Sequence, residues 1–306
     1  MVRLRLDLAY DGGAFYGWAR QPTLRTVQGE LEQALHTILR VPADDPDEPL
    51  RLTVAGRTDT GVHALHQVCH LDVGEATLDR CVGHMGVPAP EALFRRLSRM
   101  VPDDIAIHAV SVAPKGFDAR FSALERTYVY RICDDARPVD PRMRGFVLPL
   151  DDRLDLDAMN AAAAMTIGLH DFGSFATPNP GGTTIREVKR AHWSRIPVSP
   201  LVPGASGGAG TAGGYTVPAA ESGLVCFTIV ADAFARNMVR SLVNACVKVG
   251  QGRKDLNWFA EKMATPLREG STGPIAPQGL TLEHVAYPPD DHLAARAEAI
   301  RAKRTL

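Results

Sequence analysis

The residue best suited to do chemistry in this sequence is Asp59, within the segment 56–64 (GRTDTGVHA). The segment sets a carboxylate close to an arginine and a glycine, directly after an apolar run. This arrangement suggests a carboxylate that takes part in a reaction. Residues 50–55 alternate polar and apolar side chains in their upstream half, as a half-buried strand would, and the glycines permit sharp turns beyond them. Residues 64–71 return to a strand-like pattern, so we expect a loop that holds Asp59 from both sides.

Four chemical interpretations of this segment compete. One is a surface turn in which Arg57 and Asp59 form an exposed ion pair worth about 0–1 kcal/mol, and spacing alone favours it. A phosphate-binding loop fails, because Val62 and His63 stand where such a loop needs Lys followed by Ser or Thr.

A zinc site is the third interpretation, since His63, His66 and His70 recur around Cys69. A strand after Gly61 would place these side chains on different faces, and no acidic general base lies among them. We therefore predict no metal at this segment.

In the fourth interpretation Asp59 is a nucleophile or general base held by Arg57 and by another cation from elsewhere in the chain. A free Asp with a pKa of about 3.9 is ionised at neutral pH, so it needs an arginine only where burial raises its pKa. Burial is useful where water must be kept from a reactive intermediate, as in base exchange on a nucleoside.

Candidate partners for Asp59 lie in the second half of the sequence. Tyr128 and Tyr130 alternate on one predicted strand and face the same side, either as core residues or with one ring stacked on an exposed base. Arg236 and Arg240 are four residues apart on a predicted helix, where they form a solvated face or deliver a cation to Asp59.

The elements that must position these residues form two similar halves. Each half reads strand, helix, strand, strand, helix, strand, the order of a ferredoxin-like split unit, and the two halves can share one extended sheet. The fold class predicted is therefore α+β, with helices packed on a mainly antiparallel sheet. The predicted strands are 3–10, 50–55, 64–71, 105–112, 127–132, 187–195, 224–231 and 282–287, and the predicted helices are 27–40, 91–100, 156–168 and 234–250.

Chain length supports more than one unit. With 306 residues, 45% of them apolar, two domains are expected, which we place at 1–115 and 116–289, followed by a tail at 290–306 that forms a surface helix or frays. Asp59 falls in the first domain, and Tyr128 and the basic helix fall in the second. The Gly-rich segment 202–214 is predicted to be a mobile loop between two strands.

Composition narrows the class of protein. The net charge of −1 argues against binding polyanions by bulk charge alone, but residues 234–254 carry five basic side chains and no acidic one. Five scattered cysteines without a Cys-x-x-Cys pair predict no disulfide framework and favour a reducing cytoplasm. Because neither a signal peptide nor a membrane span is evident, we expect a soluble, cytoplasmic protein.

Seven blocks, in this order, closely resemble the tRNA pseudouridine synthase A family over residues 4–288. The blocks are 10–12 (YDG), 15–18 (FYGW), 26–28 (TVQ), 55–64 (AGRTDTGVHA), 118–123 (DARFSA), 170–175 (HDFGSF) and 234–240 (FARNMVR). The block around Asp59 is highly specific to this family. The other six blocks occur in the same order as in the family, which argues against a chance match. The departures are Gly29, the acidic loop 42–49, residues 78–90, the Gly-rich insertion and the tail after Pro288.

The resemblance implies a pseudouridine synthase fold and an isomerase that needs no cofactor. Asp59 is implied to attack the target uridine so that its base detaches, rotates and rejoins through C5. Arg236 is implied to pair with Asp59, and Tyr128 to lie against the target base. Arg57 and the basic helix face, which includes Arg240, would guide the RNA.

The implied substrate is tRNA, at uridines 38, 39 and 40 of the anticodon arm, bound by a homodimer whose subunits share one tRNA. Whether attack begins at C1′ of the sugar or C6 of the base, and which group removes the C5 proton, stay open. Two alternatives are an RNA-binding or RNA-chaperone protein in which Asp59 has no role, and a glycosidase that uses Asp59 with water and releases free uracil.

Overall fold

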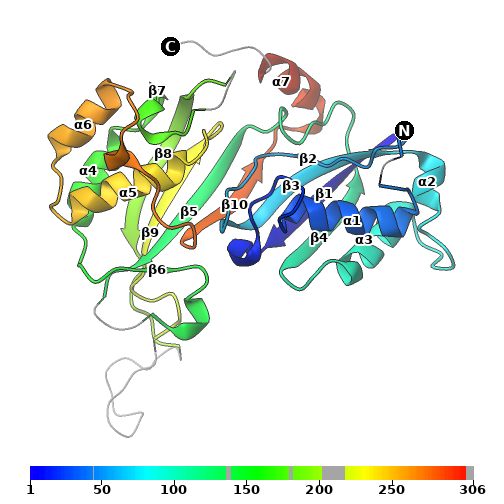
Figure 1. The fold of residues 1–306 in the computed structure, drawn as a ribbon, viewed down its shortest axis with the longest axis horizontal. Helices are drawn as coiled ribbons and strands as arrows, with labels where there is room; N and C mark the ends of the chain where they lie inside the picture. Colours follow the sequence, from blue (N-terminus) through cyan, green and yellow to red (C-terminus); the bar gives the residue numbers. More distant parts are fainter. Residues whose placement is uncertain (44, 136–138, 179–181, 202–217, 301–306) are drawn as a thin grey trace, which may run out of the picture.

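A ten-stranded sheet extends across both halves of the computed structural model, which describes residues 1–43, 45–135, 139–178, 182–201 and 218–300 (Figure 1). The strand order is β4-β1-β3-β10-β5-β9-β8-β7, with β2 paired to β3 and β6 paired to β5. The strands are β1 Val2–Tyr10, β2 Thr53–Val54, β3 His63–Val73, β4 Ile105–Val112, β5 Glu125–Cys133, β6 Leu148–Pro149, β7 Gly168–Asp171, β8 Ile185–Arg195, β9 Val225–Ala231 and β10 Leu280–Ala286.

The last strand joins the two halves of the sheet. β10 pairs antiparallel with β5 and parallel with β3, where Thr281 lies opposite His63 and Leu282 opposite Ala64. The other long strands pair antiparallel. The predicted α+β class with a mainly antiparallel sheet is confirmed, whereas the division at 115/116 stays a prediction.

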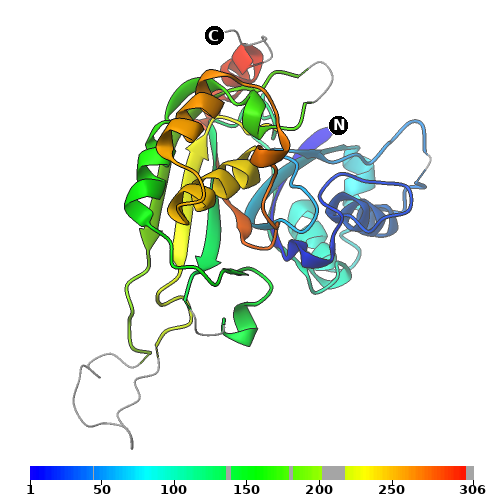
Figure 2. The same cartoon turned by 60° about the vertical axis from the view of Figure 1, so that its left-hand side comes forward.

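The helices that flank the two halves lie on one face of this sheet, as the two ribbon views show (Figures 1 and 2). On the N-terminal half they are α1 Val27–Leu39, α2 Glu75–Asp79 and α3 Ala89–Met100, and on the C-terminal half α4 Leu156–Ala164, α5 Met238–Gly250 and α6 Leu256–Ala264. After the last strand, the described part of the predicted tail consists of a short 3-10 helix, Asp290–His292, and the helix α7 Leu293–Ile300.

Alternation of apolar residues explains why β1 forms where predicted, and the spacing of Val27, Leu31, Leu35 and Ile38 explains α1. Leu4, Leu6 and Leu8 on β1 are fully buried, and burying each side chain contributes about 1.5–3 kcal/mol. Thr26 is the N-cap of α1, since its Oγ1 accepts a hydrogen bond from the Gly29 backbone N–H at 3.2 Å. These contacts fix the first half of the sheet beneath the Asp59 loop.

Three predicted elements are shorter in the structure. The strand predicted at 50–55 is reduced to Thr53–Val54, and the helix predicted at 156–168 ends at Ala164. The helix predicted at 234–250 begins only at Met238, because Asn237 adopts a left-handed conformation with φ of 64°, which a continuous α-helix does not accept. The predicted loop at 202–214 lies outside the described residues.

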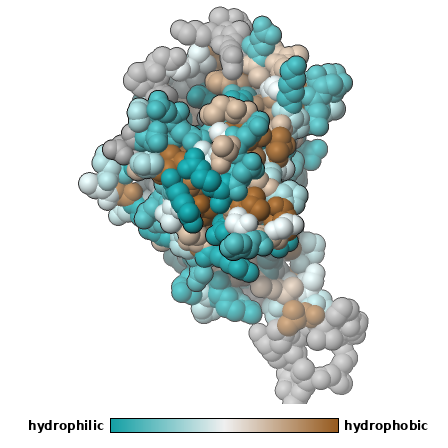
Figure 3. Space-filling view, turned by 90° about the vertical axis from the view of Figure 1, so that its right-hand side faces the viewer, coloured by the Kyte–Doolittle hydropathy of each residue, from teal (hydrophilic) through white to brown (hydrophobic). Residues whose placement is uncertain are grey.

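The surface that faces the viewer in Figure 3 is mainly hydrophilic, and its hydrophobic side chains form separate patches. Within the described residues, the helices are all too short or too polar to cross a lipid bilayer.

Candidate active site

Asp59 lies on the loop between β2 and β3, and backbone hydrogen bonds fix this loop on both sides of it. The Trp18 N–H donates to the Thr58 carbonyl at 3.1 Å, and the Gly61 N–H donates to the Phe15 carbonyl at 3.2 Å. Two segments far apart in sequence therefore hold each other. These backbone hydrogen bonds hold the loop in one position, as predicted from the sequence.

A buried side-chain network supports the same loop from beneath. The Gln67 Nε2 donates to the Tyr10 hydroxyl at 3.2 Å and to the Gly56 carbonyl at 2.9 Å, and the Tyr10 hydroxyl lies 2.8 Å from the Thr58 Oγ1. Burial raises the pKa of Tyr10 to about 12, so its hydroxyl stays neutral and can donate to Thr58.

Two glycines let these segments approach each other. Gly17 has φ of 86°, and a Cβ there would lie 2.8 Å from the Thr58 carbonyl oxygen. Gly61 has φ of 76°, and a Cβ there would lie 2.7 Å from Cγ of Pro277. Any other residue would strain the backbone and push the Asp59 loop from its neighbours.

The buried side chain of Arg126 ties the loop to the second half of the sheet. Its guanidinium donates to the carbonyls of Ala55, Arg120 and Asp232, of which the first ends the run that leads into the Asp59 loop. Burial lowers the pKa of Arg126. This residue was not among the candidates from sequence, because a single arginine on a strand carries no periodic or motif signal.

Replacing Arg126 by Met is expected to lower the free energy of unfolding by about 2–4 kcal/mol, because two buried carbonyls and one partly buried carbonyl lose their donor. Urea denaturation followed by circular dichroism measures this change. The matched control is Arg57→Met at an exposed position, where we expect a change within about 0.5 kcal/mol. If both substitutions lowered the free energy of unfolding equally, the structural role assigned to Arg126 would be contradicted.

Tyr128 lies on the helix-covered face of β5 and is only 7% exposed. Its ring meets the ring of Phe234 edge to face, with centroids 5.1 Å apart and an interplanar angle of 89°. Burial raises its pKa above the usual value, and the negative charge of Asp59 adds to the shift. The predicted aromatic partner thus lies within electrostatic range of Asp59, with a neutral hydroxyl.

Arg240 is an arginine whose pKa responds to the charge of Asp59. The Arg240 side chain is half-buried, and its Nε donates to the Ile275 carbonyl at 2.7 Å. Burial lowers its pKa, while the negative charge of Asp59 is the leading effect that raises it. A half-buried cation fixed by a carbonyl is well suited to stabilise a carboxylate.

Arg236 is exposed and precedes α5, so the helical spacing expected between Arg236 and Arg240 does not exist. Asn237 between them has positive φ, and its Nδ2 donates to the Thr177 Oγ1 at 2.8 Å. In the described residues there is no ion pair between Arg236 and Asp59. The reason is the turn at Asn237, which interrupts the face that an uninterrupted helix would have presented.

The Asp59 carboxylate itself is partly exposed and, among the residues that the structure describes, makes no hydrogen bond or ion pair. Arg57 is exposed and is likewise unpaired there, so the surface ion pair considered from spacing does not form. A rigid backbone that carries an unengaged carboxylate leaves both oxygens available to a substrate. Nucleophilic attack or proton abstraction needs that availability.

The three histidines of the segment each have a different partner. His63 and His70 accept backbone hydrogen bonds from Gly12 and Ala119 through Nδ1, whereas His66 pairs with Asp7 at 2.9 Å through Nε2. No group of three or more metal-ligating side chains occurs in the described part of the chain. These histidines hold the strand β3 in place.

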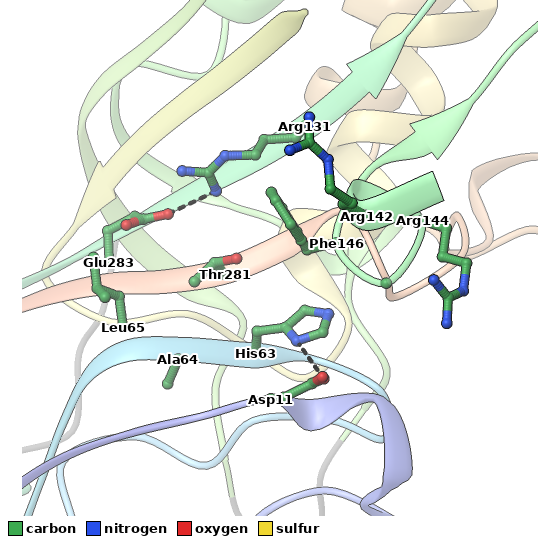
Figure 4. A pocket seen from close by; sticks show the side chains of 11 residues that line it. Asp11, His63, Ala64, Leu65, Arg131, Arg142, Arg144, Phe146, Thr281 and Glu283 are labelled. Atoms are coloured by element: carbon green, nitrogen blue, oxygen red, sulfur yellow. Dashed lines mark hydrogen bonds and ion pairs between the residues drawn. The ribbon is translucent and has the colours of Figure 1, made fainter. Parts of the chain in front are cut away.

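A cavity of about 450 Å³ opens on the other face of the sheet (Figure 4). Strand alternation puts Arg131 and Thr281 on that face, whereas the adjacent Tyr130 and Leu282 share the face of Tyr128. The guanidinium of Arg131 pairs with Glu283 at 2.8 Å across the cavity wall. The cavity is therefore separated from Asp59 by the sheet.

The structure thus combines a mainly antiparallel sheet, covered on one face by helices, with an unengaged aspartate in electrostatic range of a buried tyrosine and a half-buried arginine. The family described as tRNA pseudouridine synthase matches residues 162–288. Proteins named tRNA pseudouridine synthase A from Bifidobacterium longum and Bifidobacterium animalis subsp. lactis are 71% and 68% identical to this chain, over the full length of both chains. The protein of that name from Streptomyces griseus is 45% identical and covers all of this chain and 95% of its own.

The chain belongs to the tRNA pseudouridine synthase A family, and it is an isomerase that makes pseudouridine in tRNA. The predicted family and enzyme class are confirmed. The alternatives of a non-catalytic RNA-binding protein and of a uracil-releasing glycosidase do not agree with this membership. Which residues carry out the reaction is a matter for proposal.

Proposed function

We propose that Asp59 is the nucleophile of this synthase and that Arg240 is its charge partner. Attack by the carboxylate lets the bond between N1 and C1′ of uridine break. The base then rotates, C5 bonds to C1′, and the bond between Asp59 and the uridine breaks, which restores the carboxylate. C5 loses its proton and N1 gains one, so that product and substrate have the same atoms. The observation that carries the proposal is the unengaged Asp59 carboxylate on a loop fixed from both sides.

The other side chains have supporting roles in this proposal. Tyr128 packs against the flipped base. Its ring lies on the helix-covered face of the sheet, close enough to Asp59 for the carboxylate to affect its pKa. Arg57 and Arg236, both exposed and free of carboxylate partners in the described residues, contact phosphates of the RNA. Flipping a base out of a stem costs a few kcal/mol, which such contacts offset.

The proposed target is uridine at positions 38, 39 and 40 of the anticodon arm, modified in the cytoplasm by a homodimer that shares one tRNA. Support comes from the similarity to proteins named tRNA pseudouridine synthase A over the full length of the chain. The unpaired arginines predict binding that weakens as salt increases, because phosphate contacts release counterions.

Mapping of pseudouridine in tRNA from cells with and without this protein tests the proposed target. We expect pseudouridine at positions 38, 39 and 40 to be lost without the protein and restored by the wild-type gene. An Asp59→Asn gene, expressed to the same level, should not restore it. Loss confined to other positions of the tRNA would contradict the target, and restoration by Asp59→Asn would contradict the nucleophile.

A further inference from the structure

Tyr16 is the only exposed aromatic side chain among the Phe, Tyr and Trp residues that the structure describes, with 51% of its surface accessible. Its neighbours Phe15 and Trp18 are buried. Aromatic side chains of this size are normally buried because they carry large apolar area. An aromatic ring in solvent therefore needs an explanation.

The backbone on both sides of Tyr16 is fixed directly to the Asp59 loop. The Phe15 carbonyl accepts from Gly61, and the Trp18 N–H donates to Thr58. Tyr16 itself donates its N–H to the Arg25 carbonyl at 2.9 Å, and its carbonyl accepts from the Gln21 Nε2 at 3.0 Å. Tyr16 thus occupies a rigid position in the segment that brackets Asp59.

The side chain of Tyr16 has no partner within the described residues. Its ring takes part in no aromatic or cation–π contact there, and its hydroxyl forms no hydrogen bond. Because its backbone is already ordered, a ligand that stacks on the ring has little entropy to remove. An unengaged ring on an ordered backbone is suited to serve as a stacking platform for a base.

The charge near this ring favours a nucleic acid over an apolar partner. Arg57 lies on the loop that the Tyr16 segment brackets, and it is exposed without a carboxylate partner among the described residues. Arg20 is 60% exposed at its side chain and lies 3.6 Å from Glu32, a long contact for an ion pair. An exposed ring and exposed cations, carried by two segments that are hydrogen-bonded to each other, match the alternation of bases and phosphates in RNA.

We propose that Tyr16 is a stacking platform for an unpaired nucleotide next to the target uridine in the bound tRNA. This inference rests on the proposed role of Asp59, because that role puts the target uridine at the loop that Tyr16 adjoins. Stacking on Tyr16 holds the neighbouring nucleotide after the target base has left its stack, and so it sets the position of the target relative to Asp59. Tyr16 acts as a positioning residue.

The test compares Tyr16→Ala and Tyr16→Phe for binding of unmodified tRNA transcript, both made in an Asp59→Asn background that keeps the substrate unreacted. We expect Tyr16→Ala to weaken binding by about 5- to 100-fold, whereas Tyr16→Phe keeps the ring and stays within about twofold. In the active enzyme, Tyr16→Ala should raise KM by a larger factor than it lowers kcat. Binding by Tyr16→Ala within about twofold of its parent would overturn the proposal.

Salt dependence separates stacking from charge. Tyr16→Ala should leave the slope of log K against log salt unchanged, whereas Arg57→Ala should reduce its magnitude by about 0.7–0.9. Val112→Ala is the matched control, because Val112 is also exposed but pairs with Leu4 at the far end of β1, and it should bind tRNA as the parent does. Failure of the nucleophile assignment would show as activity of Asp59→Asn itself, which is a separate readout.

Discussion

Replacing Asp59 by Asn is expected to lower the rate of pseudouridine formation by more than about 10⁴-fold, because the amide cannot attack the uridine. The substitution keeps the shape of the side chain and removes only the charge. C5 of the target loses its proton when it bonds to C1′, so release of tritium from tRNA labelled at uridine C5 measures the reaction. Single-turnover conditions with excess enzyme separate chemistry from product release.

Folding and tRNA binding provide the controls for Asp59→Asn. The carboxylate makes no hydrogen bond within the described residues, so the free energy of unfolding should change by no more than about 0.5 kcal/mol. Binding of tRNA should be equal or slightly tighter, because one negative charge is removed from a surface that meets phosphates. An Asp59→Asn enzyme within about tenfold of the wild-type rate would refute the proposed nucleophile.

The position of Asp59 was predictable from sequence because its signals are local. A strand pattern, two glycines and a second strand pattern lie within residues 50–71, and the structure gives β2, a loop and β3 there. The ends of the elements were less predictable, since Thr53–Val54 pairs for only two residues. The local sequence pattern predicts that a loop exists. Hydrogen bonding between strands that are distant in sequence determines where the flanking strands begin and end.

The partners of Asp59 depend on contacts that no local pattern encodes. The loop is fixed by Phe15 and Trp18, and by the guanidinium of Arg126, which donates to Ala55 from 71 positions away in sequence. Tyr128 was a candidate because strand alternation indicated Tyr128 and Tyr130, and the family resemblance indicated Tyr128. Arg126 gave neither signal, although it is buried beneath the same loop.

The choice between Arg236 and Arg240 shows how one backbone angle redirects a prediction. Spacing of four residues in an apolar helical pattern places both arginines on one face. Asn237 tolerates the left-handed conformation better than most residues, but the sequence alone does not state that it adopts it. With φ of 64° at Asn237, the helix starts at Met238 and only Arg240 belongs to it.

Replacing Arg240 by Met is therefore expected to lower the rate at saturating tRNA by about 10²- to 10³-fold, the usual effect of removing one preorganised charge from a site. The same substitution at Arg236 should act on binding, with the slope of log K against log salt reduced in magnitude by about 0.7–0.9. Single-turnover rates and salt titrations of both variants measure the two effects. Met keeps the apolar stem in each case, so the pair differs only in where the charge is lost.

The Arg240 prediction also needs a check on structure, because its Nε donates to the Ile275 carbonyl. Loss of that bond should cost about 0.5–1.5 kcal/mol of stability, too little to unfold the protein. Arg240→Lys keeps a charge without the fork that can hold a carbonyl and a carboxylate together, so it should recover only part of the rate. A larger loss of rate in Arg236→Met than in Arg240→Met would show that Arg236, and not Arg240, is the charge partner of Asp59.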